Sequence, residues 1–194
     1  MKKILFLIIL LIVYQASANA QFIRGYGFKV GISVTKQNHQ WQHLEELQGD
    51  RLTFPKSLIG LNLGIFIEIL DLPYLSIPIE MNYIQRGWSG INNYYAHTFN
   101  IALLVKPRIP VNGFNPYLLI GPQFDFVIDP TFKFSQYQKE NYTGLILGIG
   151  SEFKIWELKM LTELNYDFYL DVLYQSRFLK VTTQTLSLRI GLMF

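Results

Sequence analysis

The fold is decided by residues 59–69, which read IGLNLGIFIEI. Apolar side chains occupy every second position, and glycine, asparagine and glutamate occupy most of the positions between them. Phe66 is the one large apolar residue on that second face. A period of two residues is typical of a β-strand with one apolar face, so we expect a strand here. Its length exceeds that of the usual soluble strand, which has about five or six residues.

The same alternation recurs seven more times along the chain. The other expected strands carry apolar stripes over residues 26–34, 75–83, 99–105, 118–128, 145–155, 158–168 and 186–194. No stripe residue is charged, whereas charged side chains lie on the opposite face at Lys29, Glu68, Glu80, Lys106, Asp125, Glu152, Lys154, Lys159, Glu163, Asp167 and Arg189. A charge that faces lipid at mid-depth costs roughly 2–4 kcal/mol, so this segregation favours stripes that face lipid. The alternative is a secreted, soluble up-and-down barrel or sandwich.

The connections between the expected strands alternate in length. The long ones cover residues 35–56, 87–96, 129–141 and 171–180, and the short ones cover 71–74, 110–115 and 156–157. A transmembrane barrel has short periplasmic turns and longer outer loops. Aromatic residues gather where the two membrane interfaces would lie, at Tyr26, Phe28, Tyr74, Phe114, Phe153, Trp156 and Phe194 near the turns and at Tyr83, Tyr94, Tyr95, Phe124, Phe126, Tyr166 and Phe168 near the loops. We therefore predict an all-β fold, an eight-stranded antiparallel up-and-down transmembrane β-barrel.

The first twenty residues have the order of a secretory signal peptide. Lys2 and Lys3 precede an apolar run over residues 4–14, and small and polar residues follow as far as Ala20. We expect a cleaved signal peptide over residues 1–20 and an outer-membrane β-barrel domain over residues 21–194. An N-terminal membrane anchor is the alternative, but the apolar run is too short to cross a core of about 30 Å as a helix.

Composition narrows the classes of function. Loss of residues 1–20 removes two lysines and no acid, which lowers the formal net charge from +3 to +1, so the basic character does not indicate a nucleic-acid partner. The absence of cysteine excludes disulfides, thiolate zinc sites, a cysteine nucleophile and a lipoprotein anchor. Charged residues make up 16% of the chain, against roughly 25% in ordinary soluble domains.

Several segments resemble a known family. The run over residues 79–87, IEMNYIQRG, is similar to a segment on the third strand of PorT-family outer-membrane β-barrel proteins, which are common in Bacteroidota. Residues 99–106, 116–122, 144–152 and 186–194 resemble later strands of that family. Ala102 departs from the pattern, because the family often has proline there. The resemblance implies an eight-stranded barrel in the outer membrane of a Gram-negative bacterium and a link to protein secretion, but no assigned activity.

The last strand carries a further resemblance. Apolar residues alternate from Leu186 to the terminal aromatic Phe194, as in the signal that the barrel assembly machinery of the outer membrane reads. We expect Phe194 to be this assembly signal, and the alternative is that it is only another lipid-facing aromatic. The expected partners are outer-membrane lipid and the assembly machinery, and the family resemblance adds secretion-system proteins as candidates.

The face opposite the stripes is expected to fill the interior, since an eight-stranded barrel is just wide enough for side chains. Acids and bases are nearly equal in number on that face once Arg86 and Arg108 near its ends are included. Five of these groups lie at similar depth and are expected to form one belt of ion pairs and hydrogen bonds, namely Glu80, Lys106, Glu152, Glu163 and Arg189. Buried charges need partners whatever their role, so we favour a paired plug over a proton or ion path.

The histidines are the main candidates for catalysis or metal binding. His39, His43 and His97 all lie in or beside expected outer loops. His39 and His43 are four residues apart and could bind a metal on one helical face, although a solvated loop accounts for them as well. No nucleophile is marked by a motif, so we expect a non-enzymatic protein with a structural or interaction role and without a cofactor or metal. The alternatives are an outer-surface enzyme that acts on lipid or peptide through a loop histidine, and a passive channel.

Overall fold

The computed structural model describes residues 22–41, 56–89, 93–130, 141–171, 174–175 and 179–194, and the expected signal peptide lies outside them. The strands are β1 (Ile23–Trp41), β2 (Lys56–Leu72), β3 (Leu75–Ser89), β4 (Asn93–Leu103), β5 (Lys106–Pro107), β6 (Phe114–Pro130), β7 (Asn141–Ile155), β8 (Leu158–Tyr169), β9 (Tyr174–Gln175) and β10 (Leu179–Met193). Among these residues, no helix is long and apolar enough to cross a membrane.

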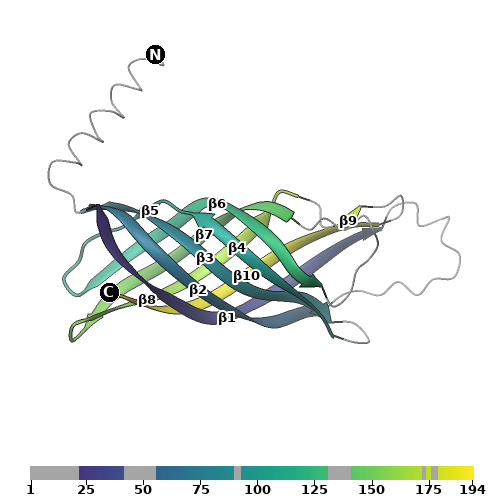
Figure 1. The fold of residues 1–194 in the computed structure, drawn as a ribbon, viewed down its shortest axis with the longest axis horizontal. Helices are drawn as coiled ribbons and strands as arrows, with labels where there is room; N and C mark the ends of the chain where they lie inside the picture. Colours follow the sequence, from purple (N-terminus) through teal and green to yellow (C-terminus); the bar gives the residue numbers. More distant parts are fainter. Residues whose placement is uncertain (1–21, 42–55, 90–92, 131–140, 172–173, 176–178) are drawn as a thin grey trace, which may run out of the picture.

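Eight long strands close into a barrel (Figure 1). Each pairs antiparallel with its neighbours in the order β1, β2, β3, β4, β6, β7, β8 and β10, and β10 returns to pair with β1. The two-residue strand β5 continues the course of β4 along β3, and β9 adds to the end of β10. The predicted fold class is therefore confirmed.

The alternation of residues separates the two faces of the wall. On β2, the side chain of Leu63 is 41% exposed, whereas that of its neighbour Asn62 is 2% exposed. The same contrast follows every long strand, so the apolar stripes form the outer surface and the second set of positions encloses a lumen. Phe66, the apolar exception on the second face, is buried inside.

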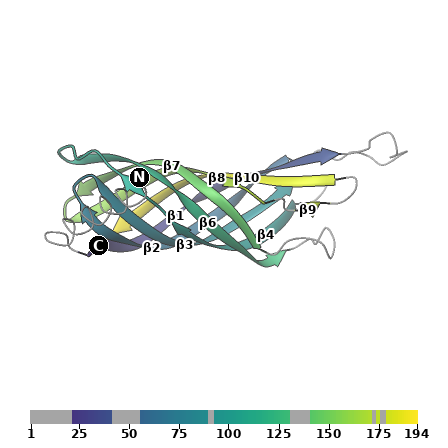
Figure 2. The same ribbon diagram turned by 90° about the horizontal axis from the view of Figure 1, so that it is seen from above.

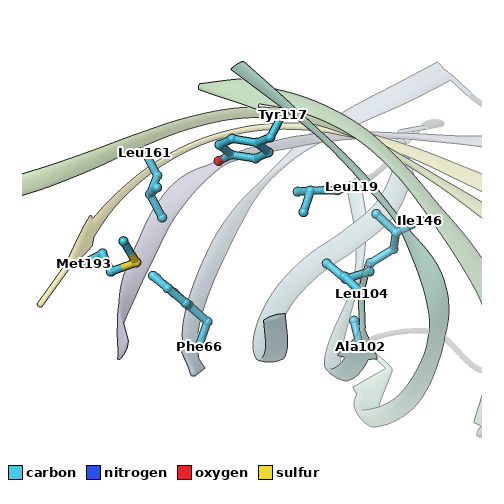
Figure 3. Close-up of a cluster of buried hydrophobic side chains, with 8 residues drawn as sticks. All are labelled: Phe66, Ala102, Leu104, Tyr117, Leu119, Ile146, Leu161 and Met193. Carbon is cyan, nitrogen blue, oxygen red and sulfur yellow. The ribbon is translucent and has the colours of Figure 1, made fainter. Parts of the chain in front are cut away.

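The lumen is less polar than the sequence pattern indicates. An apolar cluster fills part of it (Figure 3), made of Phe66, Ala102, Leu104, Tyr117, Leu119, Ile146, Leu161 and Met193. These residues lie at lumen-facing positions of six different long strands and of the segment between β4 and β5. Apart from a few other buried apolar residues, including Leu58, Ile84 and Val181, polar side chains occupy the remainder of the interior, which restricts where the charges can meet.

The strands are longer at one end than expected. The connection predicted over residues 87–96 is mostly strand, because Gly87 pairs with Tyr95 and Trp88 with Tyr94. The strand β1 continues to Trp41 and carries the backbone of His39, which pairs with Val181. Figure 2 shows that β1 and β10 run on past the ends of neighbouring strands on this side of the barrel.

The outer surface changes character along this extension. On β1, the outward positions change from Val34 to Lys36, and on β10 they change from Leu186 to Gln184. A surface covered by hydrocarbon would continue to be apolar. The apolar belt of the barrel therefore ends at Val34 and Leu186 on these strands, and the strands project beyond it.

Candidate functional site

The lumen is the candidate site, because it holds the buried charges. We name three groups of side chains along the barrel axis. The floor network, at the end with the short turns, is Arg24, Glu68, Asp71, Lys106, Arg108 and Glu152. The middle network is Lys29, Glu80, Glu163 and Arg189. The outer network is Arg86, Asp125 and Asp167.

The middle network is a closed ring of alternating charges. The Nζ of Lys29 lies 2.5 Å from Glu80 Oε1 and 2.6 Å from Glu163 Oε1. The guanidinium of Arg189 lies 2.9 Å from Glu80 Oε2 and 2.7 Å from Glu163 Oε2. Each carboxylate thus gives one oxygen to the lysine and the other to the arginine. All four groups are buried and their formal charges cancel, which is the arrangement that enclosed ions require.

The floor network depends on an irregularity in β1. Ile23 pairs with Ile69 and Gly25 with Glu68, so Arg24 is an extra residue in a β-bulge. Regular alternation would turn Arg24 toward lipid, but a bulge can redirect a side chain. The Arg24 guanidinium lies inside the barrel and forms two hydrogen bonds with Glu152, of 2.7 and 2.6 Å, and an ion pair with Glu68.

Two further cations complete the floor. The Nζ of Lys106 lies 3.0 Å from Glu68 Oε2 and 2.5 Å from Glu152 Oε1. Arg108 is bound to the turn between β2 and β3, since its Nη2 donates to Asp71 Oδ1 at 2.9 Å and its Nε donates to the carbonyl of Pro73 at 3.1 Å. Arg24 and Arg108 share the Asp71 carboxylate, so this end of the lumen is crossed by ion pairs.

Tyr117 connects the floor to the middle network. Its hydroxyl donates to Glu163 Oε1 at 2.9 Å, and the Nζ of Lys106 lies 4.1 Å from the centre of its ring. The ring takes the space beside Gly150, where a Cβ atom would lie 2.6 Å from two ring carbons. Gly150 is therefore the residue that lets an aromatic ring fill this level of the lumen.

The outer network is connected through amides. Arg86 lies 3.1 Å from Asp125 and 3.3 Å from Asp167. Asn100 donates to Asp125 at 2.8 Å and accepts from Asn82 at 3.1 Å, which links this network to the middle one. A cavity of about 10 Å³ remains among these amides, which is space for roughly one water molecule.

The five predicted lumen residues fall in two groups. Glu80, Glu163 and Arg189 lie in the middle network, whereas Lys106 and Glu152 lie in the floor network. The structure therefore has two adjacent layers, connected by Tyr117, in place of one belt. Lys154 and Lys159, counted on the lumen face from the sequence, are exposed at the turn between β7 and β8.

Sequence reasoning missed Tyr117, Arg24 and Asp71, the last of which it placed in a short connection. Tyr117 looks like one more apolar strand residue, and only its position between two charged layers shows its role. Arg24 could have been noticed, because it is a charge at a lipid-facing position of the alternation at the start of a strand. Such a residue must either lie beyond the bilayer or be turned inward by a bulge.

Comparison with known proteins identifies the family. Residues 4–194 match the family model described as outer membrane protein beta-barrel domain. The chain belongs to this family. It is an outer-membrane barrel of a Gram-negative bacterium. The short turns are therefore periplasmic, and so are the start of β1 and the end of β10, which lie at the same end of the barrel. No curated protein sequence matches the chain.

Solved structures share the fold of this outer-membrane barrel. The outer membrane protein OprG from Pseudomonas aeruginosa aligns with a TM-score of 0.54 and 13% identity, over 90% of this chain and 97% of that one. Neisserial surface protein A aligns at 0.51 and 13%, over 86% and 97%. The outer membrane protein AlkL, solved in lipid bilayers, aligns at 0.51 and 11%, over 91% and 93%. At these identities, the likeness concerns the fold alone.

The C-terminal aromatic of the barrel lies at the seam where the sheet closes. Phe194 donates its N–H to the carbonyl of Tyr26 at 2.8 Å and accepts from the Tyr26 N–H at 3.2 Å. Its ring is exposed and lies 6.2 Å from that of Tyr26 and 6.3 Å from that of Phe28. Phe194 thus has a structural role in closure besides the predicted role in assembly.

Of the three histidines, His97 is the one whose side chain the structure describes, and it lies on the outer wall of the barrel. Its Nδ1 lies 2.5 Å from the Tyr83 hydroxyl, and the two rings stack with their centres 5.8 Å apart. His43 and the side chain of His39 lie outside the described residues, so the alternative that these two histidines bind a metal falls outside them as well. Within the described part of the chain, no group of three or more histidine or acidic side chains could hold a metal ion.

Proposed function

We propose that the protein is a closed, non-enzymatic outer-membrane barrel with a structural or interaction role at its rims. The observation that carries this proposal is the ring formed by Lys29, Glu80, Glu163 and Arg189. It lies across the lumen at mid-height, and its members bond to one another. An ion that passed through would have to break pairs that the low dielectric of the interior strengthens. A passive channel is therefore disfavoured.

The geometry around His97 also favours a non-enzymatic role. A histidine that acts as a general base needs a serine or a water to activate, and a carboxylate commonly orients its ring. The partner of His97 is the phenol of Tyr83, and both residues lie on the outward face of β3 and β4. An outer-surface enzyme that acts on lipid or peptide through His39, His43 or His97 is the alternative.

We further propose membership of the PorT family within the larger family. The support is the segment over residues 79–87, which lies on β3 and supplies Glu80 to the middle network and Arg86 to the outer one. Glu80 and Arg86 both face the lumen from this one strand. Two lumen-facing charges of opposite sign explain why this short segment combines acid, amide and base. The partners proposed on this basis are secretion-system proteins, in addition to outer-membrane lipid and the barrel assembly machinery.

Two measurements test the main proposal. Purified barrel in planar lipid bilayers should give no steady conductance, and regular single-channel steps would contradict a closed lumen. When the barrel is captured from detergent-solubilised outer membranes, the same protein partner should co-purify in repeated experiments. If no partner co-purified even after crosslinking, an interaction role would be contradicted.

The enzymatic alternative has its own test. His39→Ala, His43→Ala and His97→Ala should leave the phenotype of the wild-type strain unchanged, and a deletion strain should have an unaltered lipid A mass spectrum. A change in lipid A that any one of these variants reproduces would support the enzyme and overturn the proposal.

A further inference from the structure

Two hairpins of the barrel share a sequence pattern. On β2, residues 60–68 read GLNLGIFIE, and on β7, residues 144–152 read GLILGIGSE, so both follow the pattern G-L-x-L-G-I-x-x-E. On the strands that follow them, β3 and β8, residues 80–83 read EMNY and residues 163–166 read ELNY. Apolar alternation accounts for the leucines, since every strand of the barrel has it, but not for glycine, asparagine and glutamate in the same places.

The strand register of the two hairpins follows the shared pattern. Gly64 of β2 pairs with Asn82 of β3, and Gly148 of β7 pairs with Asn165 of β8. A Cβ atom on either glycine would overlap the side-chain amide of the paired asparagine, so both glycines make room for the same group. The two hairpins therefore match in pairing and in packing as well as in sequence.

The strands that precede the two hairpins also correspond. Lys29 of β1 pairs with Gly64, and Leu119 of β6 pairs with Gly148. In each of these strands another glycine follows two residues later, at Gly31 and Gly121. The register therefore makes position 29 of β1 the counterpart of position 119 of β6.

The strands that follow the two hairpins complete the correspondence. Ala102 of β4 pairs with Glu80, and Arg189 of β10 pairs with Glu163. Position 102 is thus the counterpart of position 189. The run β1, β2, β3 and β4 corresponds strand by strand to the run β6, β7, β8 and β10.

The corresponding glutamates are the acids of two lumen networks. Glu80 and Glu163 each bind both the lysine and the arginine of the middle network. One layer closer to the periplasm, Glu68 of β2 and Glu152 of β7 each bind the same two cations of the floor network. Each layer therefore has one glutamate from each run of strands, and shared cations bridge the two.

The cations of the middle network do not repeat. Lys29 and Arg189 have Leu119 and Ala102 as counterparts, and both of these belong to the apolar cluster (Figure 3). Cations at all of these positions would enclose an excess of positive charge, because each run supplies one glutamate to this layer. Unpaired enclosed charge is costly. An apolar side chain in one run opposite a cation in the other keeps the layer neutral.

We propose that the barrel consists of two equivalent four-stranded halves related by a half-turn about its axis, and that positions 29 and 119 are interchangeable places for the lysine of the middle network. A lysine at position 119 approaches Glu80 and Glu163 from the opposite wall of the lumen. This equivalence concerns how the wall places charge and does not depend on the function proposed above.

Moving the lysine from one half to the other tests this equivalence. Lys29→Leu should lower the urea midpoint of unfolding in lipid vesicles, because Glu80 and Glu163 then share one cation. Lys29→Leu/Leu119→Lys returns the charge at the counterpart position and should recover most of the lost midpoint. A double variant that unfolds at or below the midpoint of Lys29→Leu would overturn the proposal.

A second relocation serves as the matched control. Leu58 is also a buried leucine, but it pairs with Thr35, six residues along β1 from Lys29 and roughly 20 Å away in an extended strand. Lys29→Leu/Leu58→Lys has the same composition as the test variant and should recover nothing. Equal recovery in the two double variants would show that any lysine in the barrel suffices and would contradict equivalent halves.

The test also covers a single variant that does not fold. If Lys29→Leu gives no heat-modifiable band in unboiled gels, the folded fraction replaces the urea midpoint as the measurement. A folded band for Lys29→Leu/Leu119→Lys and none for Lys29→Leu/Leu58→Lys would support the equivalence. Absence of the band in both double variants would contradict it.

Discussion

Arg24 and Glu152 form a two-point ion pair across the periplasmic end of the lumen, with N–O distances of 2.7 and 2.6 Å. The two residues lie on β1 and β7, which are not neighbours in the sheet, and are 128 positions apart in the chain. The pair therefore ties opposite walls of the barrel together. It exists only because a bulge turns Arg24 inward.

Loss of this cation should destabilise the barrel strongly. Arg24→Ala leaves Glu68 and Glu152 with one partner fewer, and breaking a buried pair costs about 3–5 kcal/mol. Arg24→Lys keeps the charge but loses the two-point geometry, so its cost should be smaller. The measurement is the free energy of unfolding from urea titration in lipid vesicles. Equal stability of Arg24→Ala and the exposed control Lys36→Ala would contradict an ion pair at the floor.

The fold followed from the sequence because one signal repeats on every strand. Leu63 and Asn62 illustrate it, since neighbouring residues of a strand must face opposite sides of the wall. Charges could not face lipid, so the direction of the lumen followed as well. The same reasoning placed Glu80, Glu163 and Arg189 at one level, because strand register converts position in the chain into depth.

The remaining features depend on geometry that alternation does not encode. The bulge at Arg24 shifts the register by one residue, and its one local sign in the sequence is a charge at a lipid-facing position of the alternation. Alternation places Leu119 and Leu161 on the lumen face, but it does not show that they pack with Phe66 and Met193 into one apolar cluster. Gly87 and Trp88 resemble a loop by composition, whereas pairing with β4 makes them strand.

The stability that the middle network gives to the barrel should depend on the network's net charge more than on the number of its ion pairs. Lys29→Met leaves Glu80 and Glu163 to share Arg189, which encloses one uncompensated negative charge. We expect a loss of about 3–5 kcal/mol in unfolding free energy. Adding Glu163→Gln restores neutrality, so the double variant Lys29→Met/Glu163→Gln should be more stable than Lys29→Met alone. A double variant whose loss equals the sum of the two single losses would rule out coupling in this ring.

The lipid-facing assignment of the stripes is tested at Leu63, near the middle of β2. Leu63→Arg places a charge in the hydrocarbon at a cost of roughly 2–4 kcal/mol and should abolish accumulation in the outer membrane. Leu63→Ile keeps the surface apolar and is the matched control. Fractionation of cells and heat-dependent migration on gels measure both. If Leu63→Arg gave a soluble, folded protein, the wall would not face lipid.

Phe194 combines two roles that one substitution can separate. Phe194→Ser keeps the two backbone hydrogen bonds with Tyr26, which do not involve the side chain, and removes a ring that is exposed. Refolding of the purified chain into lipid vesicles should therefore be nearly normal. In cells, the same variant should assemble poorly if the assembly machinery reads the terminal aromatic, and Phe194→Tyr should assemble well. The measurement is the amount of heat-modifiable barrel that each variant forms in the outer membrane, divided by the fraction that the same variant refolds in vesicles. An equal loss in both settings would assign Phe194 to packing at the seam with Tyr26 and Phe28, and normal assembly in cells would remove its role as a signal.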